Sequence, residues 1–281
     1  MSTEIIVPSI EGVQLATEAP ATDLHRHTID SKLLGGEREL VVFVPPNYDN
    51  EPHRRYPVLY MQDGQNLFDP ETAYVPGKHW RLAETATERI EKGDAESLII
   101  VGVYHAGEKR LHEYTPTRDP RQKAGGKADN YGSALVHEIK PLIDAQYRTL
   151  SGPQNTGIGG SSLGGLVSLY LGLQYPDVFG KVAAMSPSAW WHNRFIVRQV
   201  KQTLVKPRLS IWLDIGTEEG AKTLADVRAL RQALESQGWT IGQDLFFSEV
   251  TGAAHDESAW ADRVGNVLAA LFPAGNQSIA H

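Results

Sequence analysis

The sequence contains no cysteine and has no long hydrophobic run. Without cysteine there can be no disulfide, no thiolate metal ligand and no cysteine nucleophile, a composition typical of a reducing compartment. No run reaches the roughly 18 apolar residues that a membrane helix needs. The first residues show no basic stretch followed by an apolar one, so no signal peptide is visible. These absences favour a cytoplasmic protein that has no membrane partner.

Positive charge is not in excess. The chain has 27 Lys and Arg against 34 Asp and Glu, a net charge of −7, so the overall field gives no reason to expect nucleic acid as a partner. A length of 281 residues and a hydrophobic content of 41% suit a globular protein with a large core. No repeat or linker divides the chain. We predict a single domain over residues 1–281, with residues 1–21 as a surface segment.

Apolar runs alternate with helix-like segments along most of the chain. A hairpin is predicted from arms at residues 24–31 and 39–44, which flank Gly35 and Gly36. Further strands are predicted at residues 56–61, 97–104, 155–158, 181–185, 209–215 and 244–250, and helices at residues 80–90, 130–147, 163–174, 224–234 and after residue 255. This alternation predicts a mostly parallel central sheet with helices on both faces and an antiparallel N-terminal hairpin.

Two histidines lie at strand spacing in the first hairpin arm. His25 and His27 would point to the same side of a strand and could hold a metal ion together. No third ligand lies nearby in the sequence, however, and structural metal sites usually have four ligands. We therefore interpret the pair as exposed strand residues and predict no metal site.

Gly160-x-Ser162-x-Gly164 has the form of a nucleophile elbow, the strand-to-helix turn that lifts a serine hydroxyl above a sheet. The pattern alone is weak in a glycine-rich chain, and a plain turn entering a core helix is the alternative. Its context favours the elbow. A predicted strand precedes it, and residues 163–174 are apolar on nearly every face, as in a buried helix.

Functional residues of such folds lie at the carboxyl ends of the strands, and a serine nucleophile needs a histidine base oriented by a carboxylate. Three histidines follow Ser162 in the chain. His281 is the last residue, and His192 precedes the strand after which an acid is expected. His255 follows the last predicted strand, which completes the order serine, acid, histidine.

The identity of the acid stays open from spacing alone. Glu218 and Glu219 both follow the strand at residues 209–215. We favour Glu219, with Glu218 and Asp214 as the main alternatives and Asp226 as a further one. The oxyanion of an acyl-transfer intermediate would need two N–H donors. We assign them to the backbones of Leu163, which follows the serine, and Gln65, in the loop after an earlier strand.

Several motifs resemble those of the esterase family of α/β-hydrolases, which includes esterase D, feruloyl and acetyl-xylan esterases, trilactone-siderophore esterases and mycolyltransferases. The matching segments are residues 60–68, Arg110-x-x-Glu113-Tyr114-Thr115-Pro116, residues 159–165, Ser186-Pro187-Ser188 and Gly216-Thr217-x-Glu219. The resemblance runs from about residue 40 to residue 272. It implies an α/β-hydrolase fold with Ser162 as nucleophile, Glu219 as acid, His255 as base, and Gln65 and Leu163 as oxyanion donors. One departure is His112, where relatives often carry Asp.

Further candidates concern substrate binding. Trp190 and Trp191 follow a predicted strand end and suggest an apolar acyl or aryl pocket, although core packing would equally explain them. Asp63 and Arg110 are also counted as candidate substrate-binding residues. Residues 105–130 carry little apolar content and are interpreted as a rim or partial lid. A mild excess of basic residues there could receive an anionic substrate or could simply be solvated.

We therefore predict a serine carboxylic-ester hydrolase that forms an acyl-enzyme with a small or aryl/acyl ester. No metal, nucleotide or flavin cofactor is expected. The alternatives are a thioesterase or acyltransferase that uses the same three residues, and a non-catalytic binding protein with the same fold.

Overall fold

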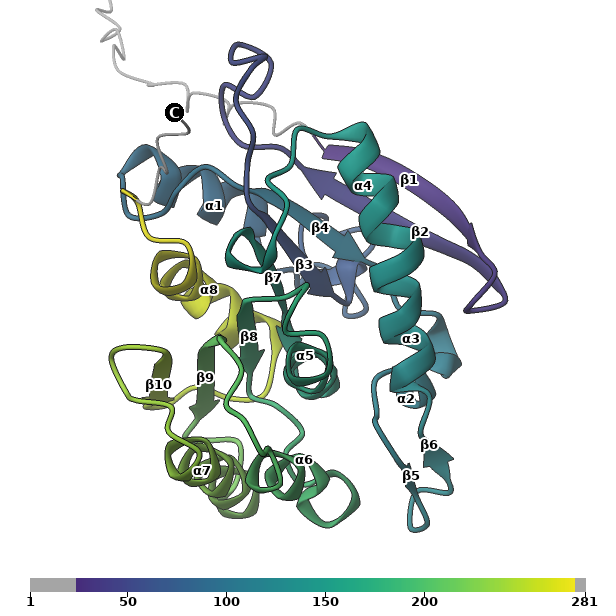
Figure 1. The fold of residues 1–281 in the computed structure, drawn as a ribbon, viewed down its shortest axis with the longest axis vertical. Coiled ribbons are helices and arrows are strands. Elements are labelled where there is room, and N and C mark those ends of the chain that lie inside the picture. The colour runs from purple at the N-terminus through teal and green to yellow at the C-terminus, as the bar shows by residue number, and fades with distance from the viewer. Residues whose placement is uncertain (1–23, 276–281) are drawn as a thin grey trace, which may run out of the picture.

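The computed structural model describes residues 24–275, and the predicted surface segment over residues 1–21 lies outside this range. Its centre is an eight-stranded sheet with the strand order β1-β2-β4-β3-β7-β8-β9-β10 (Figure 1). The strands of this sheet are β1 (Leu24–Ser31), β2 (Gly36–Phe43), β3 (Val58–Gln62), β4 (Ile99–Val103), β7 (Thr156–Ser161), β8 (Lys181–Met185), β9 (Ser210–Gly216) and β10 (Leu245–Val250). Strands β1, β2 and β4 pair antiparallel, and all the other pairings are parallel. The predicted α/β fold with an N-terminal hairpin is confirmed.

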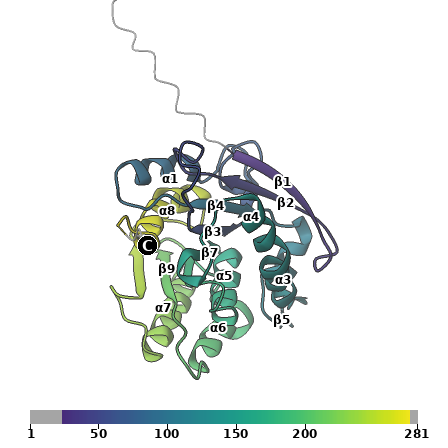
Figure 2. The same ribbon diagram turned by 45° about the horizontal axis from the view of Figure 1, so that its top comes forward.

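Helices cover both faces of the sheet (Figures 1 and 2). The α-helices are α1 (Leu82–Glu91), α2 (Arg110–Glu113), α3 (Ala128–Ala134), α4 (Lys140–Gln146), α5 (Leu163–Gln174), α6 (Trp191–Lys201), α7 (Ala221–Ser236) and α8 (Glu257–Leu271). Side chains of α1 and α8 form a hydrophobic core on one face, and those of α3 to α7 form a second core on the other. The inner strands therefore need apolar residues on both sides, and β3 and β4 are buried along their whole length.

The segment predicted as one helix over residues 130–147 is interrupted. Helices α3 and α4 are joined by a wider, π-helical turn over Leu135–Ile139. Pro141 lies in the first turn of α4 and has no N–H to donate to the preceding turn, which accounts for the break in regular hydrogen bonding. The predicted helix over residues 163–174 matches α5, and ten of its twelve residues are buried.

Helix α6 was not predicted. Its first turn contains three successive residues with positive φ, His192, Asn193 and Arg194, at 42°, 55° and 61°. Such a conformation is unfavourable for residues with side chains. Contacts from outside the turn hold it, because the Thr117 hydroxyl contacts His192 Nδ1 at 2.8 Å and Arg194 pairs with Asp226 at 2.5 Å. Local sequence preference therefore gives no signal for a helix that starts here.

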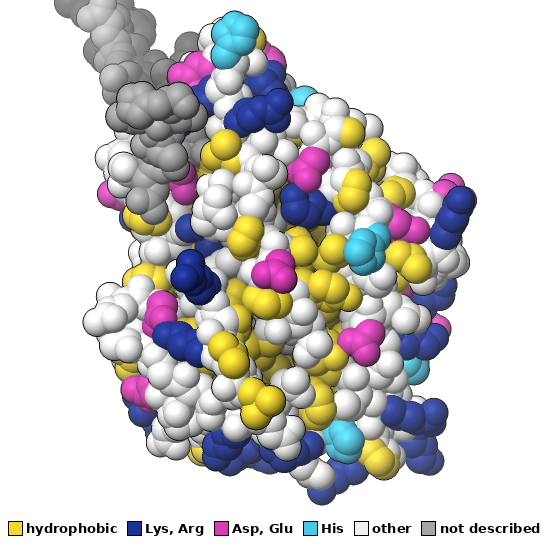
Figure 3. Space-filling model, in the orientation of Figure 1, with side chains coloured by type: hydrophobic (Ala, Val, Ile, Leu, Met, Phe, Trp, Pro, Cys, Tyr) yellow, Lys and Arg dark blue, Asp and Glu magenta, His cyan; other side chains and the backbone are white. Residues whose placement is uncertain are grey.

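Residues 105–130 form more structure than the predicted loop. They contain α2, a two-stranded ribbon of β5 (Arg118–Asp119) and β6 (Ala124–Gly125), and the start of α3. Tyr114 and Asp119 are buried although the segment carries little apolar content. In the space-filling view, Lys and Arg side chains gather along the lower edge of the molecule (Figure 3), the edge at which Figure 1 shows α6, α7 and this ribbon. Within residues 24–275, no helix is long and apolar enough to cross a membrane.

Candidate active site

Ser162 lies at the turn between β7 and α5, at the carboxyl edge of the parallel strands. Its φ of 57° and ψ of −120° are rarely adopted by residues with a side chain. The turn is hydrogen-bonded to the end of β8, because the Ser162 N–H donates to the Met185 carbonyl at 3.0 Å. The Ser188 N–H donates to the Ser162 carbonyl at 2.9 Å. The strained serine is thus fixed by backbone hydrogen bonds on both sides.

The glycines around this serine are required by close backbone approach. A Cβ atom on Gly165 would lie 3.0 Å from the Met185 carbonyl oxygen and 3.1 Å from that of Gly160. A Cβ atom on Gly160 would lie 2.9 Å from the Cβ of Gln62. The close packing of α5 on the end of β8, and of β7 on Gln62 of β3, therefore depends on the absence of a side chain at these two positions.

His255 follows β10 and places its ring between Ser162 and Glu219. Its Nε2 lies 3.0 Å from Ser162 Oγ, and its Nδ1 lies 2.6 Å from Glu219 Oε2. An ionised carboxylate can only accept, so Nδ1 donates to Glu219, and Nε2 is the nitrogen that faces the serine hydroxyl. Trp260 packs edge-on against the imidazole, with 4.9 Å between ring centroids.

The Glu219 carboxylate is buried and held by donors on both oxygens. Its Oε1 accepts from the Gly216 N–H at 2.8 Å and from the Ser186 hydroxyl at 2.5 Å, which leaves Oε2 for His255. Burial alone would raise the pKa of Glu219, but the hydrogen bonds from His255, Ser186 and Gly216 outweigh it and lower the pKa. The site therefore favours the charged carboxylate.

The other acids considered from the sequence lie elsewhere. Asp214 is buried beneath the site and contacts Arg263 at 3.1 Å and the Trp212 indole N–H at 2.8 Å. Glu218 is exposed. Asp226 lies on α7, where it pairs with Arg194 and with Lys222. Of the four candidates, Glu219 is the one that the structure brings to His255.

A pocket of about 820 Å³ opens beside Ser162. Its walls combine apolar side chains with three acids and an arginine. It is lined by Asp63, Asn66, Tyr74, Val75, His105, Gly107, Glu108, Arg110, Leu111, Ser161, Ser162, Leu163, His255, Glu257 and Trp260. The first part of the predicted rim thus borders the pocket. A pocket of this size can hold a drug-sized ligand.

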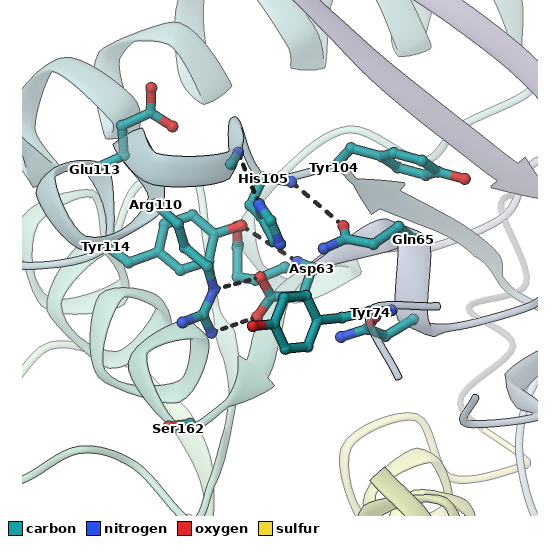
Figure 4. Close-up of polar contacts among 12 residues, drawn as sticks. Asp63, Gln65, Tyr74, Tyr104, His105, Arg110, Glu113, Tyr114 and Ser162 are labelled. Carbon is teal, nitrogen blue, oxygen red and sulfur yellow. Dashed lines mark hydrogen bonds and ion pairs between the residues drawn. The ribbon is translucent and has the colours of Figure 1, made fainter. Parts of the chain in front are cut away.

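Asp63 and Arg110 form a two-point ion pair in the pocket wall (Figure 4). Arg110 Nε lies 2.7 Å from Asp63 Oδ1, and its Nη2 lies 2.8 Å from Oδ2. Although burial opposes the charge, the Asp63 carboxylate raises the pKa of Arg110 above its usual value. Both candidate substrate-binding residues therefore border the pocket, already paired with each other.

His105 also faces the pocket, two residues after the end of β4. Its Nδ1 accepts a hydrogen bond from the Gly107 N–H at 2.9 Å, and burial lowers the pKa of the ring. The neutral ring therefore carries its proton on Nε2. His105 was not predicted as a site residue, although its position at the end of a buried strand is a signal that the sequence contains. Tyr74 and Glu257, which also line the pocket, gave no comparable signal.

The two backbones assigned to the oxyanion lie at turns on the same edge of the sheet. Gln65 belongs to a short 3-10 turn (η1, Gly64–Asn66) that begins after β3, and its side-chain oxygen accepts from the His105 N–H at 3.4 Å (Figure 4). Leu163 is the first residue of α5, so its N–H has no acceptor within the helix.

The structure does not bring the two tryptophans to this pocket. Trp191 is 1% exposed, and its indole N–H donates to the Thr117 carbonyl at 2.9 Å. Trp190 packs against Trp191 and the core cluster beneath it. Neither is among the residues that line this pocket. The core-packing alternative therefore describes their surroundings.

His25 and His27 both contact one hydroxyl. His25 Nδ1 lies 3.1 Å and His27 Nε2 lies 2.6 Å from Tyr147 Oη. Among residues 24–275, no group of three or more His, Cys, Asp and Glu side chains is arranged to hold a metal ion.

Comparison with known proteins gives one family. The model of the family described as "Putative esterase" matches residues 31–271. The chain is 29% identical over 250 residues to protein YbbA of Bacillus subtilis, covering 84% of this chain and 93% of that one. It is also 29% identical over 173 residues to the ferri-bacillibactin esterase BesA of Bacillus subtilis, with 56% of each chain covered.

A solved structure shows the same fold. The crystal structure of the enterobactin esterase FES from Shigella flexneri superimposes with a TM-score of 0.71 at 22% identity, covering 90% of this chain and 60% of that one. The family match spans most of the described residues and includes the turn at Ser162, the pocket wall and the loop of His255. The chain therefore belongs to this esterase family and is an ester-hydrolysing enzyme.

Proposed function

We propose that the chain is a serine carboxylic-ester hydrolase that works through an acyl-enzyme. The observation that carries the proposal is the pair of contacts of His255, 3.0 Å to Ser162 Oγ and 2.6 Å to Glu219 Oε2. A serine hydroxyl is a weak nucleophile until a neighbouring base takes its proton. His255 is placed to be that base, and the Glu219 carboxylate orients the ring and stabilises its protonated form.

Two half-reactions complete the cycle. Ser162 Oγ attacks the ester carbonyl while its proton passes to His255 Nε2, and the oxyanion receives hydrogen bonds from the backbones of Leu163 and Gln65. His255 then gives the proton to the leaving alcohol as its bond to the carbonyl carbon breaks, and the acyl group remains attached to Ser162 Oγ as a second ester. Water, deprotonated by the same imidazole, attacks this second ester, and His255 returns the proton to Ser162 Oγ as the acid is released. Each oxyanion donor would lower the barrier by about 3–4 kcal/mol.

The pocket supports a small ester as substrate. Its 820 Å³ could accommodate an acyl or aryl group beside Ser162, against the apolar side chains of Tyr74, Leu163 and Trp260. BesA and FES are named for siderophore esters, which places catecholate lactones among the substrates to test, together with feruloyl and simple acyl esters.

Hydrolysis of p-nitrophenyl acetate by wild type and Ser162→Ala tests the proposal. We expect kcat/KM to fall at least about 10³-fold in Ser162→Ala, because the whole nucleophile is removed. In Glu219→Gln, kcat/KM should fall about 10²- to 10⁴-fold. Glu218→Gln is the matched control on the neighbouring exposed residue and should retain wild-type activity. Equal rates in wild type and Ser162→Ala would overturn the proposal, because Ser162 would then not be the nucleophile.

A further inference from the structure

Ser186 lies beneath the carboxylate of Glu219, at the end of β8. The residue is fully buried and its φ is 40°. Its Oγ contacts Glu219 Oε1 at 2.5 Å, Trp260 Nε1 at 3.1 Å and Arg263 Nη2 at 2.6 Å. Three polar groups from two different elements thus meet on one hydroxyl.

The donors and acceptors around this hydroxyl fix the direction of each hydrogen bond. An indole N–H and a guanidinium can only donate, so Ser186 Oγ accepts from both Trp260 and Arg263. These bonds use the two lone pairs of the oxygen. The one proton of Ser186 is therefore left for the Glu219 carboxylate, which can only accept. Hydrogen bonds that run in one direction polarise and strengthen one another.

The Arg263 guanidinium, which donates to Ser186, is buried. Arg263 is 4% exposed, lies 3.1 Å from Asp214 Oδ1 and 3.6 Å from Glu219 Oε1, and comes from α8. Trp260, from the same helix, also packs on the His255 ring. Helix α8 therefore contacts the acid through Arg263 and through Ser186, and the histidine through Trp260. The charged groups that face Glu219 are His255, Arg263 and, through Arg263, Asp214.

We propose that Ser186 is a positioning residue of the active site. Its hydroxyl accepts hydrogen bonds from Trp260 and Arg263 on α8 and donates one to Glu219. It holds Oε1 so that Oε2 stays aimed at His255. The inference rests on the proposed function, because it assigns Ser186 an effect through Glu219. Ser186 itself touches neither the substrate nor the reacting oxygen in this scheme.

The test compares Ser186→Ala with Ser168→Ala, using p-nitrophenyl acetate. Ser168 lies in α5, is equally buried, and its hydroxyl has no hydrogen-bond partner within the described part of the chain. We expect kcat of Ser186→Ala to fall about 10- to 100-fold at nearly unchanged KM, the factor that a hydrogen bond to a charged group represents. Ser168→Ala should keep the wild-type kcat. Equal kcat in both variants would overturn the proposal.

Ser186→Gly guards against a variant that fails to fold. Glycine adopts a positive φ without strain, so this change removes the hydroxyl and leaves the backbone relaxed. We expect the same loss of kcat as in Ser186→Ala. A wild-type rate in Ser186→Gly would show that only the backbone at this position matters, and would also overturn the proposal.

A double-mutant cycle with Glu219→Ala separates positioning from a general structural effect. If Ser186 acts through the carboxylate, Ser186→Ala should not lower the residual kcat of Glu219→Ala any further. A further loss of the same size as in the wild-type background would contradict this route. Loss of activity in Ser162→Ala is independent of these outcomes, so the two proposals can fail separately.

Discussion

Arg110 holds both carboxylate oxygens of Asp63, at 2.7 and 2.8 Å, in the wall of the pocket that contains Ser162. The side chain of Asp63 is 9% exposed and that of Arg110 is 26% exposed, so neither charge is fully hydrated. The ion pair links the turn after β3, which carries Asp63, to helix α2, which begins at Arg110. Because the two charges satisfy each other, the arginine has less capacity to bind an anionic substrate than its position suggests.

Removing one partner of this pair should destabilise the protein. Asp63→Asn or Arg110→Gln leaves the other charge in the wall without its counter-ion, so we expect each to lower the free energy of unfolding by about 1–3 kcal/mol. The double variant should cost less than the sum of the two, because no unpaired charge remains. Urea denaturation of the four proteins measures this coupling. Strictly additive losses would show that the two side chains act independently.

The lowered pKa of Glu219 makes stability depend on pH. A carboxylate whose pKa is lower in the folded state stabilises the fold above its unfolded value, here 4.5, and this contribution is lost as the pH falls through the folded pKa. Wild type should therefore lose more free energy of unfolding below about pH 4.5 than Glu219→Gln does. Urea titrations from pH 7 to pH 3 measure the difference. Parallel curves would mean that Glu219 has the same pKa in both states.

Gly165 should not tolerate a side chain. Gly165→Ala would place a Cβ atom 3.0 Å from the Met185 carbonyl oxygen, so α5 must move away from β8. We expect a loss of about 1–3 kcal/mol in the free energy of unfolding, together with lower activity, since the Ser162 turn moves with the helix. Ser168→Ala in the same helix is the control. Thermal melts and p-nitrophenyl acetate kinetics check both effects, and unchanged values would show that the backbones can separate freely.

The positions of the main elements could be predicted because their apolar patterns are strong and their ends are marked. Residues 163–174 coincide with α5, whose apolar run is bounded by the glycine turn before it and by Tyr175-Pro176 after it. Helix α6 could not be predicted, because its left-handed first turn depends on contacts with residues 75 and 32 positions away in the chain. In residues 105–130, burial of Tyr114 likewise depends on packing against Tyr131.

The site was predictable in outline and less so in its surroundings. The order of Ser162, an acid and His255 could be read from three strand ends, whereas the choice between Glu218 and Glu219 depends on how one turn is folded. In that turn Glu219 points inward to Gly216 and Ser186, and Glu218 is exposed. The environment of Trp191 could not be predicted from the sequence either, because a tryptophan near a strand end can face a pocket or the core.

Covalent labelling of Ser162 tests most directly whether this serine is the nucleophile. The full-length protein is treated with a fluorophosphonate, which reacts with serines activated by a neighbouring base, and the modified peptide is identified by mass spectrometry. We predict one adduct per chain, on Ser162, which is absent from Ser162→Ala and strongly slowed in His255→Ala. An unmodified Ser162 in protein that hydrolyses p-nitrophenyl acetate, or an adduct on another residue, would contradict the account.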